Sequence, residues 1–156
     1  MKSRNHLANK RSARFSAGFT LIELMITIAL IAIFGGLGLF VSMDFYRRYS
    51  FYADQGALVS ILRRAREYSL ANIGSVPHGI RITDDQYILF QGTSYANRDS
   101  QYDEPIQKSP SILTQGISEI VFTPLSATSS TSGIITISNS IQSRDIEINS
   151  EGRINW

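Results

Sequence analysis

A run of twenty uncharged residues, from Leu24 to Met43, constrains this chain more than any other feature of its sequence. As an α-helix with a rise of about 1.5 Å per residue, the run spans roughly 30 Å, the thickness of the hydrocarbon core of a bilayer. A removable secretory signal is the alternative, but its apolar core has only about 7–15 residues and is followed by small residues. Asp44, Phe45 and Tyr46 follow here instead. The run is therefore expected to cross a membrane.

Positive charge is concentrated before this run. Residues 1–18 hold five cations and no acid, which leaves ten cations against thirteen acids in residues 19–156. Because positive charge is retained in the cytoplasm, the N-terminus is predicted to be cytoplasmic and the C-terminal part extracytoplasmic. The net charge of +2 gives no argument for a nucleic-acid partner, since it depends on this basic leader. The absence of cysteine excludes disulfides, thiolate metal sites and thiol nucleophiles.

The helical pattern continues beyond the uncharged run but becomes amphipathic. Its apolar residues recur mainly at intervals of three and four, with charged residues between them: Phe45, Tyr49, Tyr52, Val59, Leu62, Ala65 and Tyr68. The helix is expected to end near residues 72–74, where Gly74 is a candidate C-cap and Pro77 prevents extension. A single helix of about 50 residues follows. The three aromatic residues at the start of its amphipathic part, 45, 49 and 52, are interpreted as a helix–helix or helix–sheet contact.

Strand signals fill the rest of the chain. Alternating or β-branched runs predict strands at 79–83, 87–91, 117–123, 134–138 and 145–149, with 153–156 as a possible last strand. Residues 92–111 and 124–133 are predicted to be surface loops. The expected fold is α+β, with the long helix packed on an antiparallel β-sheet or small β-sandwich. The apolar face of this sheet is predicted to include Ile80, Ile82, Ile146 and Ile148.

The junction between the leader and the uncharged run carries the most specific motif. Gly18-Phe19-Thr20-Leu21-Ile22-Glu23, placed between a basic leader and an apolar helix, resembles the prepilin signature of type IV pilins and type II secretion pseudopilins. The resemblance implies that prepilin peptidase cleaves after Gly18 and methylates the new amino terminus at Phe19. It also implies that the apolar helix remains as membrane anchor and later forms part of a filament core.

The resemblance extends more weakly to the rest of the chain. A long helix, a strand-rich head and an ending with Gly152-Arg153 look like the GspH/FimT group of minor pilins. The implied organisation is a cleaved leader (1–18), a transmembrane and filament-core helix (19–43), its amphipathic continuation (44–74) and a β-rich head (75–156). The implied protein is a single-pass inner-membrane subunit without a cofactor. Its implied partners are prepilin peptidase, other pilin subunits, an assembly ATPase and the inner-membrane platform.

Glu23 has two readings that are compatible with each other. A carboxylate in a membrane helix is unfavourable unless it is paired or protonated. Thr20-x-x-Glu23 fits a capping box, in which an acid is also favoured by the helix dipole. By the family resemblance, cleavage creates an amine at Phe19, and Glu23 of one subunit pairs with that amine in a neighbour. We favour an assembly role over capping alone.

The residues outside the membrane segment give little support for an enzyme. His78 is the single histidine there and is expected to lie in a loop without a partner. The acid pairs Asp84-Asp85 and Asp103-Glu104 lie in turn-like sequence, where aspartate is expected for backbone reasons. A calcium site built from Asp99, Asp103 and Glu104 is conceivable but matches no defined loop, so no metal site is predicted.

Two other functions remain as alternatives. One is a DNA-binding, FimT-like pilin, in which a Gly-Arg-x-basic ending contributes contacts. Here Arg153 keeps the first basic position, but Asn155 replaces the second. The arginines of the helix, including Arg63 and Arg66, are expected to lie away from Arg153, so nucleic acid is not expected as a partner. The other alternative is a plain single-pass anchored protein.

Overall fold

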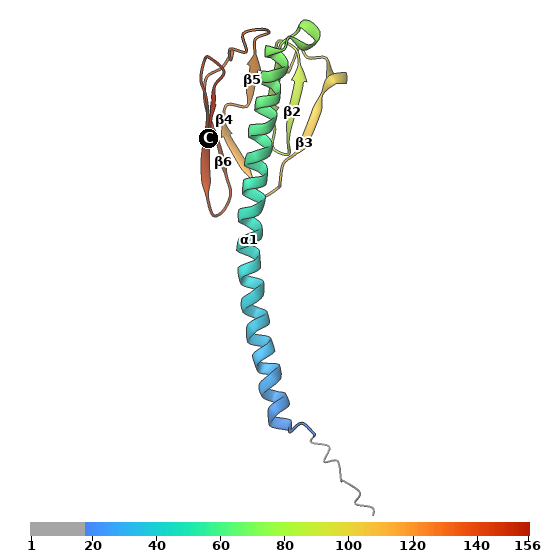
Figure 1. Cartoon of the computed structure of the whole chain (residues 1–156), viewed down its shortest axis with the longest axis vertical. Coiled ribbons are helices and arrows are strands. Elements are labelled where there is room, and N and C mark those ends of the chain that lie inside the picture. The colour runs from blue at the N-terminus through green and yellow to red at the C-terminus, as the bar shows by residue number, and fades with distance from the viewer. Residues whose placement is uncertain (1–17) are drawn as a thin grey trace, which may run out of the picture. The chain divides into compact units, whose positions relative to one another are not determined.

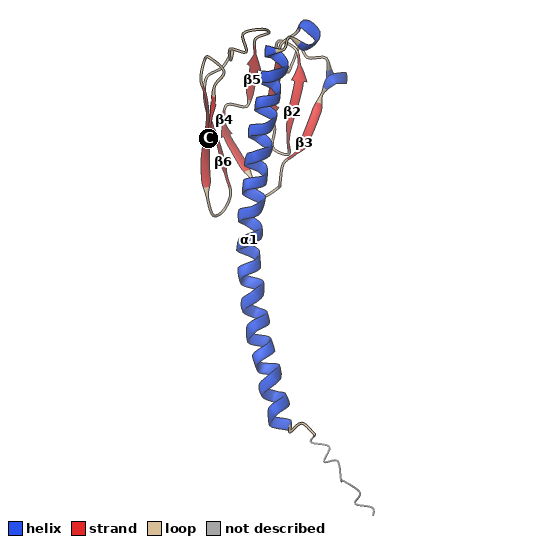
Figure 2. Ribbon diagram, in the orientation of Figure 1, coloured by secondary structure: helices blue, strands red, loops and turns tan. Residues whose placement is uncertain are grey.

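The computed structural model describes residues 18–156, and a single long helix begins three residues into this part. Helix α1 covers Leu21–Leu70, which confirms the predicted length of about 50 residues. Figures 1 and 2 show the helix and the strand-rich region that follows it in the chain. Residues 1–17, including the leader cations, lie outside the described residues.

Two compact units divide the chain, one ending at Phe40 and one comprising Val41–Trp156. From Leu21 to Leu37 the large apolar side chains of α1 are exposed, with exposed fractions between 47% for Leu30 and 77% for Leu21. This helix is long and apolar enough to cross a membrane. Such exposure of large apolar side chains indicates a surface that lipid or another protein must cover.

The second unit begins with the C-terminal half of α1, which ends one turn before the predicted cap. Asn72 takes up the left-handed conformation that terminates the helix (φ 53°), and its N–H donates to the carbonyl of Ser69. Gly74 was the expected cap, but it lies in the following 3₁₀ turn, Ile73–Ser75. Asparagine can replace glycine at such a position because its short polar side chain tolerates positive φ.

In the described part of the chain, eight strands form two antiparallel sheets rather than one. The first sheet has the order β3-β2-β1-β5, with β1 at His78–Ile82, β2 at Gln86–Gln91, β3 at Glu104–Gln107 and β5 at Glu119–Phe122. The second has the order β4-β6-β7-β8, with β4 at Leu113–Gly116, β6 at Gly133–Ser138, β7 at Ser143–Ile148 and β8 at Ile154–Asn155. The α+β class is confirmed, and the sandwich alternative describes the head better than a single sheet.

Two strands lie where the sequence pattern predicts none. β3 lies within the predicted loop 92–111, and the separate strand β4 precedes the predicted strand 117–123, which is reduced to 119–122. Both are edge strands, and their burial patterns are largely exposed. Pro105 fits an edge position because proline cannot donate to a second neighbour. Edge strands bury little apolar surface, so they carry a weak hydrophobic pattern.

The core of the second unit lies between α1 and both sheets. Leu58, Leu62 and Ala65 of the helix are fully buried. The four isoleucines predicted for one apolar face are also buried, but they are divided between the sheets, with Ile80 and Ile82 in β1 and the other two, Ile146 and Ile148, in β7.

The buried face of α1 differs from the predicted one where the amphipathic part of the helix begins. Phe45, Tyr49 and Tyr52 are 72%, 66% and 53% exposed, so they make no buried contact with the rest of residues 18–156. Phe51 is buried instead, together with Ile112 and Ile137. The periodicity of a helix identifies which residues share a face, but the sheet decides which face is covered.

Candidate functional site: the start of the helix and the basic depression of the head

The start of α1 has the features of a capped helix. The backbone N–H of Glu23 donates to the Thr20 hydroxyl at 3.3 Å, and the N–H of Leu24 donates to the Thr20 carbonyl at 3.1 Å. Thr20 is therefore the N-cap, which satisfies one of the free N–H groups of the first turn. The predicted capping role of Thr20 is therefore confirmed.

The Glu23 carboxylate completes no capping box. Within residues 18–156 it makes no hydrogen bond or ion pair, although the Glu23 carbonyl accepts a bond from the Thr27 hydroxyl. Gly18 and Phe19 precede the helix, and Phe19 is 85% exposed. The described part of the chain thus presents an unpaired acid one turn from the predicted cleavage point, on a helix whose other side chains there are apolar.

Gly152 and Arg153 lie in a tight turn between β7 and β8. Gly152 has φ +75°, and its N–H donates to the Asn149 carbonyl at 2.9 Å. The backbone N–H of Arg153 donates to Oδ1 of Asn149 at 2.7 Å, and the Arg153 side chain is exposed. A Cβ at position 152 would collide with the carbonyl oxygen of Ala127. Both the backbone conformation and the close approach therefore require glycine here.

Arg153 lies close to two arginines of the helix, although the sequence led us to expect it to lie away from them. Arg63 and Arg66 of α1 line the same depression as Arg153, together with Glu67; its volume is about 410 Å³. The guanidinium of Arg63 also stacks over the ring of Trp156, 4.1 Å from its centroid. Three cations and one acid therefore surround this depression.

The sequence does predict that Arg63 and Arg66 lie together, since residues three apart share a helix face. The convergence with Arg153 depends on how β8 returns to the helix, and the sequence does not show this. Neighbouring Arg64 leaves the depression and pairs with Glu104 of β3.

His78 begins strand β1, although a loop was expected, and it is only 3% exposed. Its ring packs edge-on against Tyr68, with 5.5 Å between the ring centroids. Its backbone N–H donates to the Ser69 hydroxyl at 2.9 Å. Burial lowers the pKa of His78 below its ordinary value of 6.5. The imidazole is thus neutral at physiological pH.

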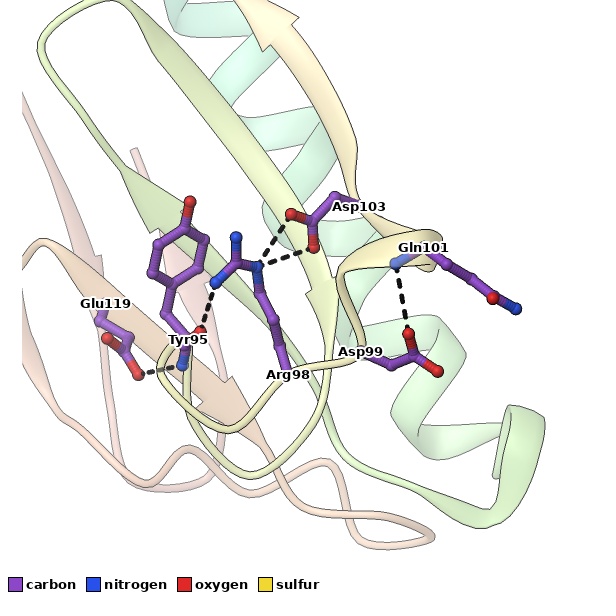
Figure 3. Close-up of polar contacts among 6 residues, drawn as sticks. All are labelled: Tyr95, Arg98, Asp99, Gln101, Asp103 and Glu119. Atoms are coloured by element: carbon purple, nitrogen blue, oxygen red, sulfur yellow. Dashed lines mark hydrogen bonds and ion pairs between the residues drawn. The ribbon is translucent and has the colours of Figure 1, made fainter.

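Of the two acid pairs predicted to lie in turns, only Asp84-Asp85 does so, because Glu104 begins strand β3 and both Asp103 and Glu104 form ion pairs. Asp84 and Asp85 form the β1–β2 turn, where the Thr83 hydroxyl donates to Asp85 Oδ1 at 2.9 Å. Figure 3 shows how the β2–β3 loop is held: Nε of Arg98 donates to both carboxylate oxygens of Asp103, at 3.0 and 2.8 Å. A carboxylate held in this way is a structural element of the loop.

The residues considered for calcium do not converge on a cation. The Asp99 carboxylate accepts the N–H of Gln101 at 3.2 Å, as Figure 3 also shows, while Glu104 turns to Arg64. Across residues 18–156 there is no group of three or more histidines or acids that could hold a metal ion.

A buried polar cluster joins α1 to the segment after β3. The carboxylate of Asp54, 6% exposed, accepts the N–H of Ser109 at 3.1 Å. Nζ of Lys108 donates to the Thr83 carbonyl at 2.9 Å and to the Thr114 hydroxyl at 3.2 Å. Burial lowers the pKa of Lys108. Because both charged groups have hydrogen-bond partners, the cluster is a structural connection and offers no free reactive group.

The comparison with known families points to the start of the helix. Residues 14–39 match a family model described as the prokaryotic N-terminal methylation motif. This match and the apolar helix support a subunit of the type IV pilin and pseudopilin class, a structural class processed by prepilin peptidase and assembled with other pilins. They also fit a membrane-anchored protein. No curated protein and no solved structure matches the chain.

Proposed function

We propose that this chain is a minor pilin or pseudopilin of the GspH/FimT type, cleaved after Gly18 and N-methylated at Phe19. It is stored in the inner membrane with its head, residues 75–156, on the extracytoplasmic side. The assembly ATPase and its membrane platform extract it into a type II secretion pseudopilus or a type IV pilus. Its function is that of a filament subunit, with no catalytic step of its own.

The observation that carries this proposal is the arrangement at the start of α1. Gly18 and Phe19 are exposed outside the helix, where a peptidase can reach the bond between them. The large apolar side chains that follow, from Leu21 to Leu37, are exposed. A filament subunit needs such a surface, since the same side chains contact lipid before assembly and neighbouring helices afterwards.

Glu23 supports the same proposal because its carboxylate is unpaired within the described residues. Cleavage would create an amine at Phe19, four residues away in sequence. A carboxylate in an apolar environment is stabilised strongly by a cation at short range. We propose that Glu23 of one subunit pairs with the Phe19 amine of a neighbour, which would set the axial position of the incoming subunit.

Processing provides the direct test. Co-expression with a prepilin peptidase should shorten the chain to residues 19–156, measured by intact mass and N-terminal sequencing. Gly18→Val should abolish this change, because a branched side chain next to the scissile bond obstructs the peptidase. Gly56→Val is the matched control, since it makes the same change at an exposed helix position far from the cleavage point. A mature terminus at any other residue would contradict the assignment.

A second candidate function, DNA uptake by a FimT-like pilin, is favoured by one observation. Arg63, Arg66 and Arg153 line one depression, and Trp156 stacks on Arg63 at its edge. Clustered arginines beside an aromatic ring are typical of sites that bind nucleic-acid backbones and bases. Glu67 in the same depression and Asn155 at the second basic position weigh against this function.

A further inference from the structure

A short segment of α1 just beyond the uncharged run combines exposed aromatic rings with exposed arginines. We call this segment the aromatic–arginine belt; it consists of Phe45, Tyr46, Arg47, Arg48 and Tyr49. The three rings are 72%, 71% and 66% exposed, and both arginines are exposed as well. Every helical residue from 42 to 49 is exposed, which is more than two turns. The sheets therefore cover no side of the helix at the belt.

The position of the belt along the helix matches one layer of a membrane. At 1.5 Å per residue, the belt lies about 3–9 Å beyond Met43, the last residue of the uncharged run. The headgroup regions add about 10–15 Å in total to a hydrocarbon core of about 30 Å, which is roughly 5–7 Å on each side. Since the uncharged run is long enough to fill the core, the belt lies at the depth of the extracytoplasmic headgroups.

The side chains of the belt suit this layer. A tyrosine has an apolar ring and a polar hydroxyl, and such rings are enriched where hydrocarbon meets headgroups. An arginine can lay its aliphatic stem along apolar surface while its guanidinium binds a phosphate in two places. Ser42, Met43, Tyr46 and Arg47 line a shallow depression of about 300 Å³. An apolar side chain, a ring and a cation thus lie together, as a phosphate attached to acyl chains requires.

The charge of the segment favours an anionic surface. Within residues 18–156, neither Arg47 nor Arg48 forms an ion pair. Asp44 is the one acid among residues 42–49, so these residues carry two positive charges and one negative charge. A neighbouring helix would cover only one side of the belt, whereas a lipid leaflet surrounds the helix. Exposure on all sides and the net positive charge together favour lipid headgroups over a second copy of the chain.

The head contacts the helix at the level of the belt. Nδ2 of Asn139, in the turn between β6 and β7, donates to the carbonyl of Arg47 at 3.1 Å. Oδ1 of the same asparagine accepts the N–H groups of Ile141 and Gln142 at 3.0 and 2.9 Å, which fixes the turn. Lipid bound at the belt would therefore also meet this turn of the head.

We propose that the belt binds anionic phospholipid headgroups of the extracytoplasmic leaflet and so sets the height of the head at the membrane surface. The ligand class is a lipid phosphodiester with a net negative charge. The arginines bind the phosphates, and the rings lie between the headgroups and the first carbons of the acyl chains. This inference rests on the membrane-anchored state in the proposed function, but it depends on neither cleavage nor filament assembly.

The test measures which lipid lies next to the belt in vesicles that contain the full chain. Trp156 is the single tryptophan, so Trp156→Phe gives a background in which Tyr46→Trp places an indole in the belt. Its fluorescence is quenched with brominated phosphatidylglycerol in phosphatidylcholine, and with the bromine on the other lipid. The two curves give the relative association constant. We expect the anionic lipid to be favoured about fivefold, as one net cation near the surface predicts.

Paired arginine variants in this background identify the source of the preference. Arg47→Gln combined with Arg48→Gln should abolish it, because both belt cations are lost. Arg63→Gln combined with Arg153→Gln is the matched control, since it removes the same charge from exposed positions at the basic depression. Arg63 lies about 24 Å beyond Arg47 along the helix, farther than the Debye length of about 8–10 Å. The control should keep the preference.

A probe in the anchor separates failure of the belt from failure of the proposed function. Ile33→Trp in the same background should be quenched by both brominated lipids, since Ile33 is an exposed residue of the uncharged run. Quenching there without a lipid preference at the belt would overturn the belt alone. No quenching there would overturn the membrane anchor and the belt together.

Two further results would contradict the proposal. One is protection of the Tyr46→Trp indole from both lipids, as a contact with a second copy would give. The other is an equal loss of preference in the Arg63 and Arg153 control. Circular dichroism of each variant verifies that the helix and the sheets are retained.

Discussion

At the scale of single residues, the glycine of the Gly152-Arg153 motif is required by the backbone conformation of the turn. Its φ of +75° and its contact with the Ala127 carbonyl leave no room for a side chain. Gly152→Ala should lower the free energy of unfolding by about 2–4 kcal/mol, through strain and collision together. Gly56→Ala is the control: its Cβ would meet no atom within 4 Å, and alanine should stabilise the helix by up to about 1 kcal/mol. Thermal unfolding monitored by circular dichroism measures both, and equal effects would contradict the argument.

His78 should make the stability of the head depend on pH. Its pKa is lowered by burial, so the unfolded chain binds a proton at a pH where the folded protein does not. The stabilising contribution is therefore complete above about pH 6.5 and decreases as the pH falls toward the lower pKa of the folded state. His78→Gln should flatten this part of the profile.

Denaturation midpoints between about pH 5 and 8 measure this effect in wild type and variant. Asp103 and Glu104 line the same depression as His78, and Tyr68 packs on its ring. Since these groups are present in both proteins, the difference between the two profiles isolates the histidine. Identical profiles would show that His78 does not contribute.

At the scale of elements, helix α1 allows capping and assembly to be separated. Glu23→Val removes a charge from an apolar helix and should leave membrane insertion intact, while incorporation into sheared filaments decreases strongly. Thr20→Ala removes the hydroxyl that accepts the Glu23 N–H and should cost about 1 kcal/mol of helix stability, with incorporation largely retained. Each is measured on the cleaved fraction. If the two variants were incorporated into filaments equally well, Glu23 would have no role in assembly beyond the start of the helix.

At the scale of the whole molecule, charge argues against strong DNA binding. Residues 44–156 hold ten cations against twelve acids, and Glu67 lies among the three arginines of the basic depression. Affinity for the phosphate backbone depends on how many phosphates are neutralised. We expect the mature chain to bind duplex DNA no more tightly than micromolar in a gel shift at about 0.15 M salt.

Arginine variants locate any binding that the gel shift detects. Arg153→Ala removes a cation from the depression, whereas Arg144→Ala removes an exposed cation from β7 outside it. Sub-micromolar affinity that is lost with Arg153→Ala and kept with Arg144→Ala would favour the DNA-uptake function over the one proposed. Equally weak DNA binding by the wild type and both variants would support the proposed filament-subunit function over DNA uptake.

The helix and the central strands could be predicted because their signals are local. A run of uncharged residues, a periodicity near 3.6 and short β-branched runs each act within a few residues of the chain. The helix of about 50 residues and strands such as β1, β2, β6 and β7 were predicted within a few residues of their bounds. The edge strands β3 and β4 were missed, because strands paired on one side and exposed on the other need no apolar pattern.

The sequence by itself determined the processing motif, the anchor helix and the α+β class, because each depends on residues adjacent in the chain. Tertiary structure alone decided which helix face is buried, so that Phe51 lies inside while Tyr49 and Tyr52 are exposed. It also decided that Arg63, Arg66 and Arg153 share one depression and that His78 is buried against Tyr68. These outcomes depend on which surfaces two sheets and a helix bury together, and burial is a property of the packed chain that no local pattern contains.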